Sequence, residues 1–381
     1  MNFRAINKEY EKLKCPDNVF NPCKLPLTQD KYFFICTERS VGKTTNVLLW
    51  GMCAHKLEGI QIQYIRQFGD MIERKNLRQL FSTILEFGYI EKITGGRYKD
   101  LQYYAHAWYY CNYDDDGKIL ERATDPFMVC LSLDQTDTYK STYNAPKGDL
   151  IVFDEAIGHR YPQDEFIRFC DLIMTIARSR TTPIIFMLAN TIDRFHPYFY
   201  EMELNDIVAT MPLGEHCETV THEGTPIYVD FYSPEKTEYK RKFNSLYFGF
   251  KNKKLGSITG KDWTITPMPH PVRDNTREIL IRCFFIQYED KYIQLELCRS
   301  DNDGTHIIAH FADEKKIRPD SIIYSMGLML DWRYRYKFGY TRADRVIWTL
   351  YDRKKFFYAS NAVGALVEKY VANCKEYRYL Y

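Results

Sequence analysis

The sequence predicts an α/β fold with a central, mostly parallel sheet and a second, smaller domain towards the C-terminus. In the first 200 residues, short apolar runs typical of buried strands alternate with longer segments of helical spacing. After residue 232 the composition changes, and basic residues gather among Gly, Ser and Pro. We therefore expect three parts: residues 1–232, a basic linker or small subdomain over 233–262, and a domain over 263–381.

Five apolar runs of the first part are predicted strands: Tyr32–Cys36, Ile60–Ile65, Phe127–Leu131, Leu150–Phe153 and Ile184–Leu188. Three segments have helical spacing: Thr44–Leu57, Met71–Phe87 and Asp164–Arg180. Beyond the linker we expect strands over 277–288, 291–298 and 305–311, followed by helical stretches over 321–338 and 356–377.

Composition narrows the class of protein. The chain has 381 residues, of which 45% are hydrophobic and only 34 are Gly or Pro (19 and 15), which excludes collagenous and disordered chains. The net charge of +2 means that attraction to nucleic acid must come from local patches. No apolar run approaches the roughly 20 residues of a membrane span, so we expect a soluble, intracellular protein without a membrane partner. The 11 cysteines include no C-x-x-C pair, which favours reduced thiols over a structural zinc site.

The strongest local signal begins where the first predicted strand ends. Residues 37–44 read T-x-x-x-x-G-K-T, and a phosphate-binding loop needs backbone N–H groups at a helix N-terminus, a lysine for the β/γ-phosphates and a hydroxyl for Mg²⁺. Gly42, Lys43 and Thr44 supply all but the first glycine, whose place Thr37 takes. The alternative is an ordinary helix start with Thr37 or Ser40 as N-cap. The candidate nucleotide-binding residues are Thr37, Glu38, Arg39, Ser40, Val41, Gly42, Lys43, Thr44 and Thr45.

A second signal lies about 110 residues downstream, where the apolar run LIVF leads directly into Asp154 and Glu155. An acid at the C-terminal tip of a buried parallel strand lies where α/β folds bind ligands. Asp154 and Thr44 are therefore candidate Mg²⁺ ligands, and Glu155 is a candidate base for the attacking water. Alone, the pair could be an acidic turn, but a phosphate loop followed by these acids indicates a nucleoside triphosphatase core with ATP and Mg²⁺ as cofactors.

Two further polar residues belong to this region. The run PIIFMLAN ends in Asn190, which can hydrogen-bond the lytic water or end the strand as a turn residue. Arg178 and Arg180 lie at the end of the predicted helix Asp164–Arg180, where they either complement the helix dipole or, for Arg178, act as an arginine finger towards a neighbouring subunit.

The order of these residues resembles a known family. The runs FFICTERSVGKTT, YIRQ, YKSTYNAPKGDLIVFDEAI and ARSRTTPIIFMLANTIDRFHPYF are similar to the DNA-packaging ATPases of phi29-like podophages. These are small relatives of the terminase large subunits, within the additional-strand P-loop ATPases. The resemblance covers about residues 30–200 and implies that an extra strand separates the loop strand from the acidic strand.

The resemblance also implies roles for single residues. Arg39 is the arginine within the phosphate loop, Arg178 is the trans-acting arginine, and Lys140 falls on a basic residue used in trans or for DNA contact. Thr37 and Ser40 depart from the family pattern, because each replaces a glycine and loses its freedom at positive φ. The implied partners are double-stranded DNA, the portal of a procapsid, a structural packaging RNA and further copies of the chain in a ring, a pentamer in that family. The implied location is the host cytoplasm.

In that family the C-terminal domain is RNase H-like, and nuclease activity there needs several carboxylates around two metal ions. Of the acids in the predicted strands 277–288 and 291–298, only Glu296 lies inside a strand rather than at its start. One such carboxylate does not make a two-metal site, so we expect a vestigial nuclease. Basic residues of 236–254, Lys240, Arg241 and Lys242 among them, form either a solvated linker or a set of contacts to DNA, RNA or portal. Three other functions stay open: a terminase with an active nuclease, a nucleotide-binding scaffold without turnover, and a helicase-like ATPase.

Overall fold

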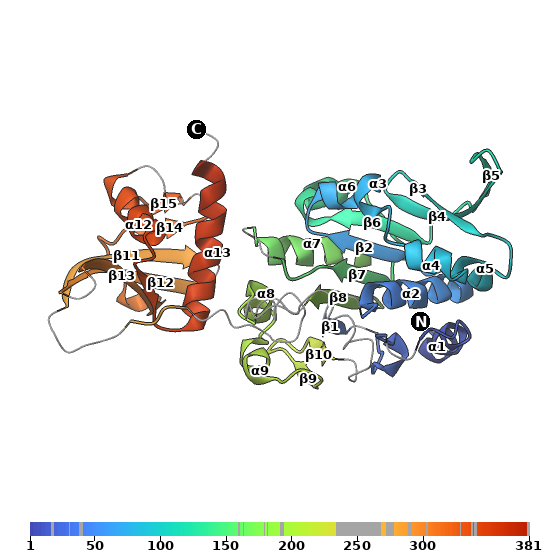
Figure 1. Ribbon diagram of the computed structural model, residues 1–381, viewed down its shortest axis with the longest axis horizontal. Coiled ribbons are helices and arrows are strands. Elements are labelled where there is room, and N and C mark those ends of the chain that lie inside the picture. The colour runs from blue at the N-terminus through green and yellow to red at the C-terminus, as the bar shows by residue number, and fades with distance from the viewer. Residues whose placement is uncertain are drawn as a thin grey trace, which may run out of the picture. The chain divides into compact units, whose positions relative to one another are not determined.

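The computed structural model divides into two compact units (Figure 1). Unit 1 consists of Met1–Ile157, Phe166–Ile192 and Met202–Trp263, and unit 2 of Gly158–Glu165, Asp193–Glu201 and Thr264–Tyr381. The structure describes the chain except residues 17–18, 30, 38–40, 159–160, 163, 179, 181, 191–193, 234–267, 272–277, 289–290, 302–303, 328, 337, 339–340 and 379–381. The predicted basic segment 233–262 therefore lies, apart from its first residue, outside the described residues.

Unit 1 is built on a 10-stranded sheet in the order β3-β4-β6-β2-β7-β8-β1-β10-β9, with β5 paired to β4. The six strands from β6 to β10 in this order are parallel, and β3, β4, β5 and β9 are antiparallel additions at the edges. The predicted mostly parallel sheet is confirmed. The strands are β1 Tyr32–Thr37, β2 Ile62–Arg66, β3 Asp100–Tyr104, β4 Ala107–Tyr113, β5 Ile119–Arg122, β6 Met128–Ser132, β7 Leu150–Asp154, β8 Ile184–Asn190, β9 His216–Val220 and β10 Pro226–Tyr232.

The position of β8 decides the type of sheet. β8 pairs with β1 on one side and with β7 on the other, so it separates the strand before the phosphate loop from the strand that ends in Asp154. This is the extra strand that the resemblance implies. The fold is therefore that of the additional-strand class of P-loop proteins.

The helices of the first 210 residues are mostly short. They are α1 Phe3–Glu11, α2 Lys43–Glu58, α3 Arg74–Leu77, α4 Ser82–Glu86, α5 Tyr89–Thr94, α6 Thr136–Thr142, α7 Glu165–Ala177, α8 Pro197–Glu201 and α9 Asn205–Thr210, with 3-10 turns η1 Pro22–Lys24, η2 Gly69–Ile72 and η3 Leu133–Gln135. The two long ones agree with the predicted helices over 44–57 and 164–180.

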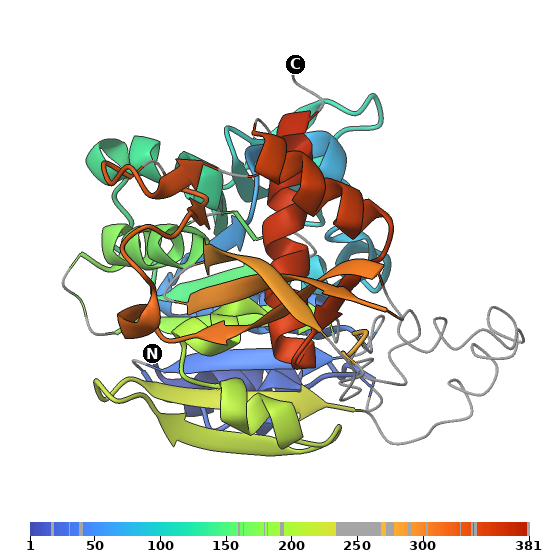
Figure 2. The same cartoon turned by 90° about the vertical axis from the view of Figure 1, so that its left-hand side faces the viewer.

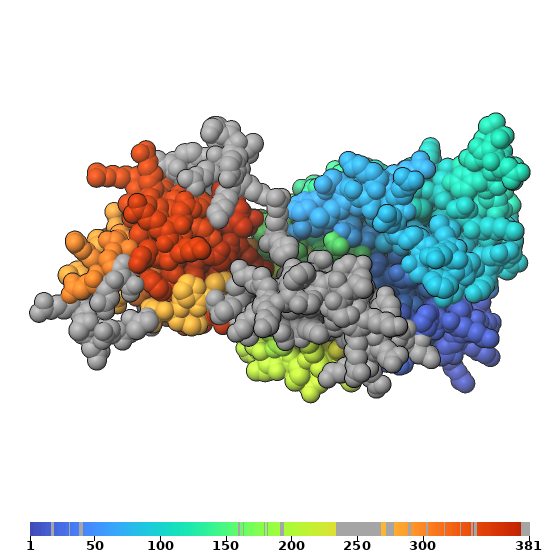
Figure 3. All heavy atoms as spheres, in the orientation of Figure 1, coloured from blue at the N-terminus to red at the C-terminus, as the bar shows by residue number. Residues whose placement is uncertain are grey.

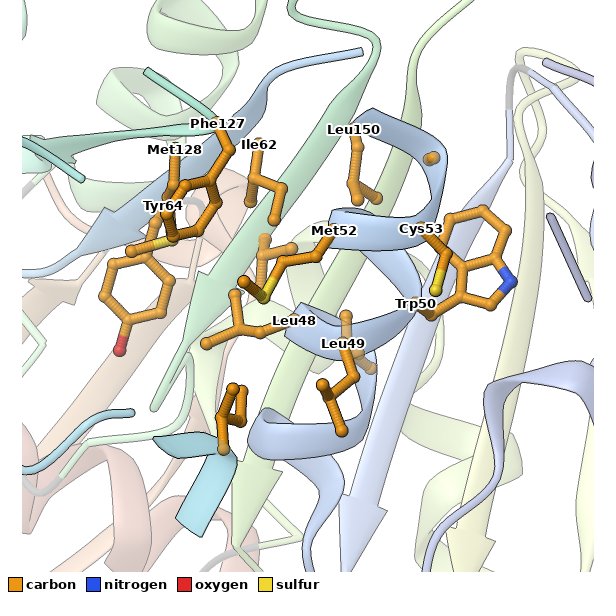
Figure 4. Close-up of a cluster of buried hydrophobic side chains, with 14 of the residues drawn as sticks. Leu48, Leu49, Trp50, Met52, Cys53, Ile62, Tyr64, Phe127, Met128 and Leu150 are labelled. Atoms are coloured by element: carbon orange, nitrogen blue, oxygen red, sulfur yellow. The ribbon is translucent and has the colours of Figure 1, made fainter. Parts of the chain in front are cut away.

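These two long helices cover opposite faces of the sheet. Figure 4 shows α2 lying over the strands, with Leu48 and Met52 packed towards Ile62 and Leu150. On the other face Phe169 of α7 packs on Phe153 of β7, with ring centroids 5.1 Å apart. Successive residues of a strand face opposite sides of the sheet. Leu150 and Phe153 are three positions apart, so Leu150 packs against α2 and Phe153 packs against α7. The core of unit 1 thus fixes the ends of β1, β7 and β8 relative to the start of α2.

The structure corrects the predicted helix over Met71–Phe87. The chain here forms η2, α3 and α4, which lie on the surface of unit 1 (Figure 3, light blue). Glu73 is extended (φ −68°, ψ 149°) and breaks the helix between η2 and α3. Asn76 Nδ2 donates to the carbonyl of Asp70 at 2.5 Å, which stabilises this break.

Unit 2 contains a six-stranded sheet in the order β15-β14-β11-β12-β13-β16. β11, β12 and β13 are consecutive antiparallel strands, and β14 and β15 continue the sheet in parallel beyond β11. α13 lies across one face of this sheet (Figure 2). The elements are β11 Ile279–Tyr288, β12 Lys291–Ser300, β13 Gly304–Ala312, β14 Ile323–Ser325, β15 Tyr334–Tyr336, β16 Phe356–Tyr358, η4 Glu314–Lys316, α12 Arg342–Asp352 and α13 Asn361–Arg378.

The predicted helical stretch over 321–338 is wrong, since it contains β14 and β15. Ile323 and Tyr324 are 2% and 1% exposed and pair with the centre of the sheet through β11. A short, fully buried apolar run has the same pattern in a parallel strand as in a buried helix, so periodicity could not separate the two. No helix among the described residues is long and apolar enough to cross a membrane.

Candidate nucleotide-binding site

The candidate phosphate loop joins β1 to α2. Gly42 is the N-cap of α2 in the left-handed region (φ 74°) and supplies no side-chain cap, and Lys43 is the first helical residue. Thr37 is the last residue of β1 and is fully buried, so it is not the helix cap. Glu38, Arg39 and Ser40 lie outside the described residues.

The remaining loop residues are fixed from both sides. The carbonyl of Val41 accepts from Phe20 N at 2.9 Å, and Asn46 Nδ2 donates to the carbonyl of Gly42 at 2.8 Å. Thr45 lies in the first turn of α2, among the N–H groups that an anion at a helix start would contact. The second half of the loop therefore forms a helix N-terminus, and hydrogen bonds to the carbonyls of Val41 and Gly42 hold the residues that lead into it.

The sheet brings Lys43 and Asn190 together. Thr37 pairs with Asn190 across β1 and β8, so the ends of the two strands are level. Lys43 Nζ donates to Asn190 Oδ1 at 2.6 Å, and Lys43 is only 9% exposed. The Lys43 ammonium, which we predict to bind the phosphates, is thus held beside Asn190 at the end of β8.

The two candidate Mg²⁺ ligands are also adjacent. Thr44 Oγ1 donates to Asp154 Oδ1 at 3.0 Å, although the residues are 110 positions apart in the sequence. A hydroxyl and a carboxylate oxygen are the hard donors that Mg²⁺ prefers. The donor set therefore fits the ion that the sequence implies.

Two residues that sequence reasoning did not assign complete this side of the site. Tyr64 OH donates to Asp154 Oδ2 at 2.8 Å. Arg66 Nη1 lies 3.2 Å from Tyr64 OH and 3.5 Å from Asp154 Oδ2, and Arg66 Nη2 contacts Glu155 Oε2 at 2.5 Å. Burial lowers the pKa of Arg66, but Tyr64, Asp154 and Glu155 outweigh burial and raise it. The signal for both residues is their position at the end of β2, next to β7 in the sheet.

Glu155 has an unusual backbone. Its φ is 57°, in the left-handed region that a non-glycine residue adopts at a cost of about 1–3 kcal/mol. Asp154 Oδ1 accepts from Glu155 N at 3.1 Å, and the ion pair with Arg66 holds the side chain. The strained turn directs the Glu155 carboxylate out of the strand, where it is 56% exposed while Asp154 is 7% exposed. The buried acid suits a metal ligand, and the exposed acid suits proton transfer with water.

Arg178 ends α7 in the left-handed region (φ 42°). Its Nη2 donates to the carbonyl of Tyr143, and the side chain is exposed. Arg180 donates to the carbonyls of Ile176 and Ala177 at the end of α7, as in the helix-terminal alternative of the sequence analysis. Both arginines also reach the segment before β7: Arg178 contacts the Tyr143 carbonyl, and Arg180 donates to the Pro146 carbonyl and lies 3.4 Å from Asp149 Oδ1.

Lys140 of α6 forms ion pairs with Asp137 and Asp171 at 3.0 Å each, and its hydrogen bonds to these two carboxylates raise its pKa. Lys240, Arg241 and Lys242 lie outside the described residues. In unit 2, Glu296 Oε1 accepts from Gln294 Nε2 at 2.9 Å and lies 3.1 Å from His310 Nε2.

A pocket of about 650 Å³ in unit 1 was not predicted from the sequence. Its lining includes Val19, which a Cβ on Gly42 would contact at 3.4 Å, so the pocket begins beside the phosphate loop. Tyr10 lines it and donates to Asn46 Oδ1 at 2.6 Å. No sequence motif indicates this pocket, because its residues come from the end of α1, the turn η1 and the segment between them. The lining residues are Tyr10, Glu11, Lys14, Cys15, Pro16, Val19, Asn21 and Lys24.

The fold and this arrangement define the class of additional-strand P-loop proteins. Among solved structures, the Phi-28 gp11 DNA packaging motor aligns with 94% of this chain and 99% of its own, with a TM-score of 0.60 and 18% identity. The N-terminal domain of the DNA packaging ATPase from bacteriophage phi29 aligns with 55% of this chain and 92% of its own, at 18% identity and a TM-score of 0.40. The large terminase ATPase domain of Thermus phage P74-26 aligns with 68% of this chain and 98% of its own, at 14% identity and a TM-score of 0.40.

No family model and no curated protein matches the sequence. The fold shared with the Phi-28 DNA packaging motor confirms the resemblance that the sequence predicted. At these identities the likeness concerns the fold.

Proposed function

We propose that this chain is an ATP-hydrolysing subunit of a motor that drives double-stranded DNA into a viral procapsid. The observation that carries the proposal is the convergence of Lys43, Thr44, Asp154 and Asn190 at the ends of adjacent parallel strands, through bonds of 2.6 and 3.0 Å. Separate segments of the sequence supply these groups, and each has the chemistry that nucleoside triphosphate hydrolysis needs. The fold shared with the Phi-28 packaging motor directs the proposal towards DNA packaging.

In this function each residue has one role. Lys43 and the first N–H groups of α2 bind the phosphates. Glu155 accepts a proton from the attacking water, and Asn190 contacts the γ-phosphate from the neighbouring strand. Thr44 and Asp154 hold Mg²⁺, which when bound neutralises phosphate charge. Tyr64 and Arg66 are positioning residues, because they contact the two acids and hold them in place.

The assembly is a head-to-tail ring in which Arg178 reaches the nucleotide of a neighbouring copy. The exposure of Arg178, and its bond to a loop carbonyl that a stronger anion can replace, support this role. Lys140, Lys240, Arg241 and Lys242 are candidates for contact with DNA or a neighbouring copy. The portal of the procapsid and a packaging RNA are the further partners, and the host cytoplasm is the location.

The test is steady-state ATP hydrolysis by the purified chain, alone and with duplex DNA plus procapsids. We expect DNA and procapsids to raise the rate, and Glu155→Gln to abolish turnover while nucleotide still binds. Full activity of Glu155→Gln would remove Glu155 from its role. Binding without hydrolysis in every wild-type combination would favour the scaffold, with Thr37 in the loop as its explanation.

Mixed subunits test the ring. Lys43→Ala removes nucleotide binding in its own subunit, and Arg178→Ala removes the finger offered to a neighbour. We expect mixtures of the two variants to regain ATPase activity that neither shows alone, because some interfaces combine an intact site with an intact arginine. A mixture as inactive as its components would contradict a trans role for Arg178. Plasmid nicking in Mn²⁺ would instead favour a terminase with an active nuclease, and a preference for single-stranded DNA would favour a helicase.

A further inference from the structure

One cluster of potential metal ligands in unit 2 takes no part in the function proposed above. Among the described residues, ligand atoms of Glu278, Cys298 and His306 all lie within 4.8 Å of one another. Glu278 immediately precedes β11, Cys298 lies near the end of β12 and His306 lies near the start of β13. The spacings between them are 20 and 8 residues, so no sequence motif reveals the group.

Strand register brings the three side chains to one face of the sheet. Cys298 pairs with His306 across β12 and β13, and with Leu280 across β12 and β11. Residues that pair directly point to the same side, as do residues two apart on one strand. Glu278 lies just before β11, and its carboxylate reaches His306 Nε2 at 2.7 Å on that face.

Hydrogen bonding gives His306 the orientation of a metal ligand. His306 Nδ1 lies 3.0 Å from the carbonyl oxygen of Gly304. A carbonyl only accepts, so Nδ1 carries the proton and Nε2 is the nitrogen with a lone pair to offer. Metal-binding histidines are oriented in this way, with the second ring nitrogen donating to a backbone carbonyl. His306 Nε2 lies 2.7 Å from Glu278 Oε1, where a proton bridges the two groups.

Burial distinguishes this group from surface acids. Cys298 and His306 are 3% and 2% exposed, and the ring of Phe357 packs edge-on against His306 at 5.5 Å. Glu278 is 35% exposed and leaves an entry path from solvent. A buried thiol and a buried imidazole thus lie beside one partly exposed carboxylate, and together they offer three ligand atoms to an ion.

We propose that Glu278, Cys298 and His306 bind a zinc-type divalent ion in unit 2. Sulfur, imidazole nitrogen and carboxylate oxygen are the ligand types of Zn²⁺, whereas Mg²⁺ avoids thiolate. In a tetrahedral Zn²⁺ site such atoms are about 3.3–3.6 Å apart, so Glu278 needs to swing outwards from His306 by less than ~1 Å. Water supplies the fourth ligand, and binding releases the proton of the Cys298 thiol and the proton shared by His306 and Glu278. The ion ties β11, β12 and β13 together.

The experiment uses Co²⁺ as a probe on the full-length chain after chelator treatment. We expect one equivalent of Co²⁺ to produce a thiolate-to-metal charge-transfer band and intense tetrahedral d–d bands. Zn²⁺ should abolish these bands by displacement, and excess Mg²⁺ should leave them unchanged. Zn²⁺ should also raise the temperature at which unit 2 unfolds, because it binds the assembled site more tightly than the unfolded chain.

Three variants assign the ligands. Cys298→Ser should remove the charge-transfer band, and Glu278→Gln, at the exposed ligand, should weaken Co²⁺ at least about tenfold without unfolding the chain. Cys283→Ser, a half-buried cysteine on the same sheet, is the matched control and should keep the spectrum. If wild type shows no charge-transfer band, the proposal is overturned. It is equally overturned if the band survives in Cys298→Ser, or if affinity is unchanged in a folded Glu278→Gln variant.

Discussion

Two buried tyrosines of unit 1 differ in whether the hydroxyl has a hydrogen-bond partner. Tyr64 donates its hydroxyl to Asp154, whereas the hydroxyl of Tyr110 is buried without a hydrogen-bond partner among the described residues. A hydrogen bond to a charged group contributes about 1.5–3 kcal/mol, and an unpaired buried hydroxyl is a net cost. The same chemical change at the two positions should therefore have opposite effects on stability.

We expect Tyr64→Phe to destabilise the chain by about 1.5–3 kcal/mol and to lower ATP turnover roughly tenfold, because Asp154 loses a partner that orients it. Tyr110→Phe should leave turnover unchanged and be neutral or stabilising. Urea denaturation and steady-state hydrolysis measure the two effects. Equal losses in both variants would show that the Tyr64 hydroxyl has no special role.

Asp230 makes stability depend on pH. It lies in β10 beside Ile35 of β1, where burial raises its pKa to about 6 and His216 lowers it slightly. The folded chain thus holds this proton more tightly than the unfolded chain, whose carboxyl has the usual value near 3.8. The stability that Asp230 contributes is complete below about pH 4 and is lost as the pH rises through about 6.

Asp230→Asn should therefore be more stable than wild type at pH 8 by about 2–3 kcal/mol, the equivalent of a shift of two pKa units. Near pH 4 the two proteins should unfold at the same denaturant concentration. Unfolding curves across this pH range measure the difference. A constant gap at all pH values would mean that the ionisation of Asp230 is not its origin.

At the scale of elements, α2 approaches the sheet through Gly51. A Cβ on Gly51 would lie 2.6 Å from Leu150 Cδ2 and 2.7 Å from Ile62 Cδ1, and both neighbours are fully buried. Alanine improves helix propensity by about 1 kcal/mol, but overpacking a dense core costs about 1–3 kcal/mol. The contact with the sheet should outweigh the propensity.

We expect Gly51→Ala to lower the free energy of unfolding and Gly51→Val to lower it further. Leu57→Ala is the control on the same helix, because Leu57 is 43% exposed and its truncation should change stability by less than about 0.5 kcal/mol. A thermal melt of each variant is sufficient. A stabilised Gly51→Ala variant would show that the helix can move off the strands at little cost.

The elements also show what the sequence can and cannot reveal. The strands that end at Thr37, Asp154 and Asn190 were predictable because buried parallel strands are continuous apolar runs ended by polar residues. Their order was implied only by resemblance, since apolar runs carry no information on which strands are neighbours. Tyr64 and Arg66 were missed for this reason, because they join the site only through the pairing of β2 with β7.

At the scale of the whole molecule, the division of the chain does not follow the sequence order. The segments Gly158–Glu165 and Asp193–Glu201 belong to unit 2, although they follow the ends of β7 and β8 directly. Gly158 comes three residues after Glu155, and Asp193 three residues after Asn190. Both candidate catalytic strand ends are thus covalently joined, over a few residues, to segments that fold with the C-terminal sheet.

Tyr161 anchors the first of these segments inside unit 2. Its ring is fully buried, and its carbonyl accepts from Asn373 Nδ2 at 2.9 Å and Tyr288 OH at 3.2 Å. The rings of His196 and Tyr198, from the second segment, pack edge-on against it at 5.4 and 5.6 Å. Both segments are therefore held within unit 2 through Tyr161 and its neighbours.

We expect Asn373→Ala to accelerate amide hydrogen exchange over 158–165 roughly fivefold, the equivalent of one lost hydrogen bond of about 1 kcal/mol. Asn112→Ala is the matched control, because Asn112 Nδ2 donates to the carbonyl of Arg97 at 2.8 Å in unit 1. Its effect should remain local and leave 158–165 unchanged. A non-hydrolysable ATP analogue should slow exchange over 158–165 and 193–201 in wild type, and less so in Asn373→Ala. If nucleotide binding left the amide exchange rates of both segments unchanged, these segments would not couple the nucleotide site to unit 2.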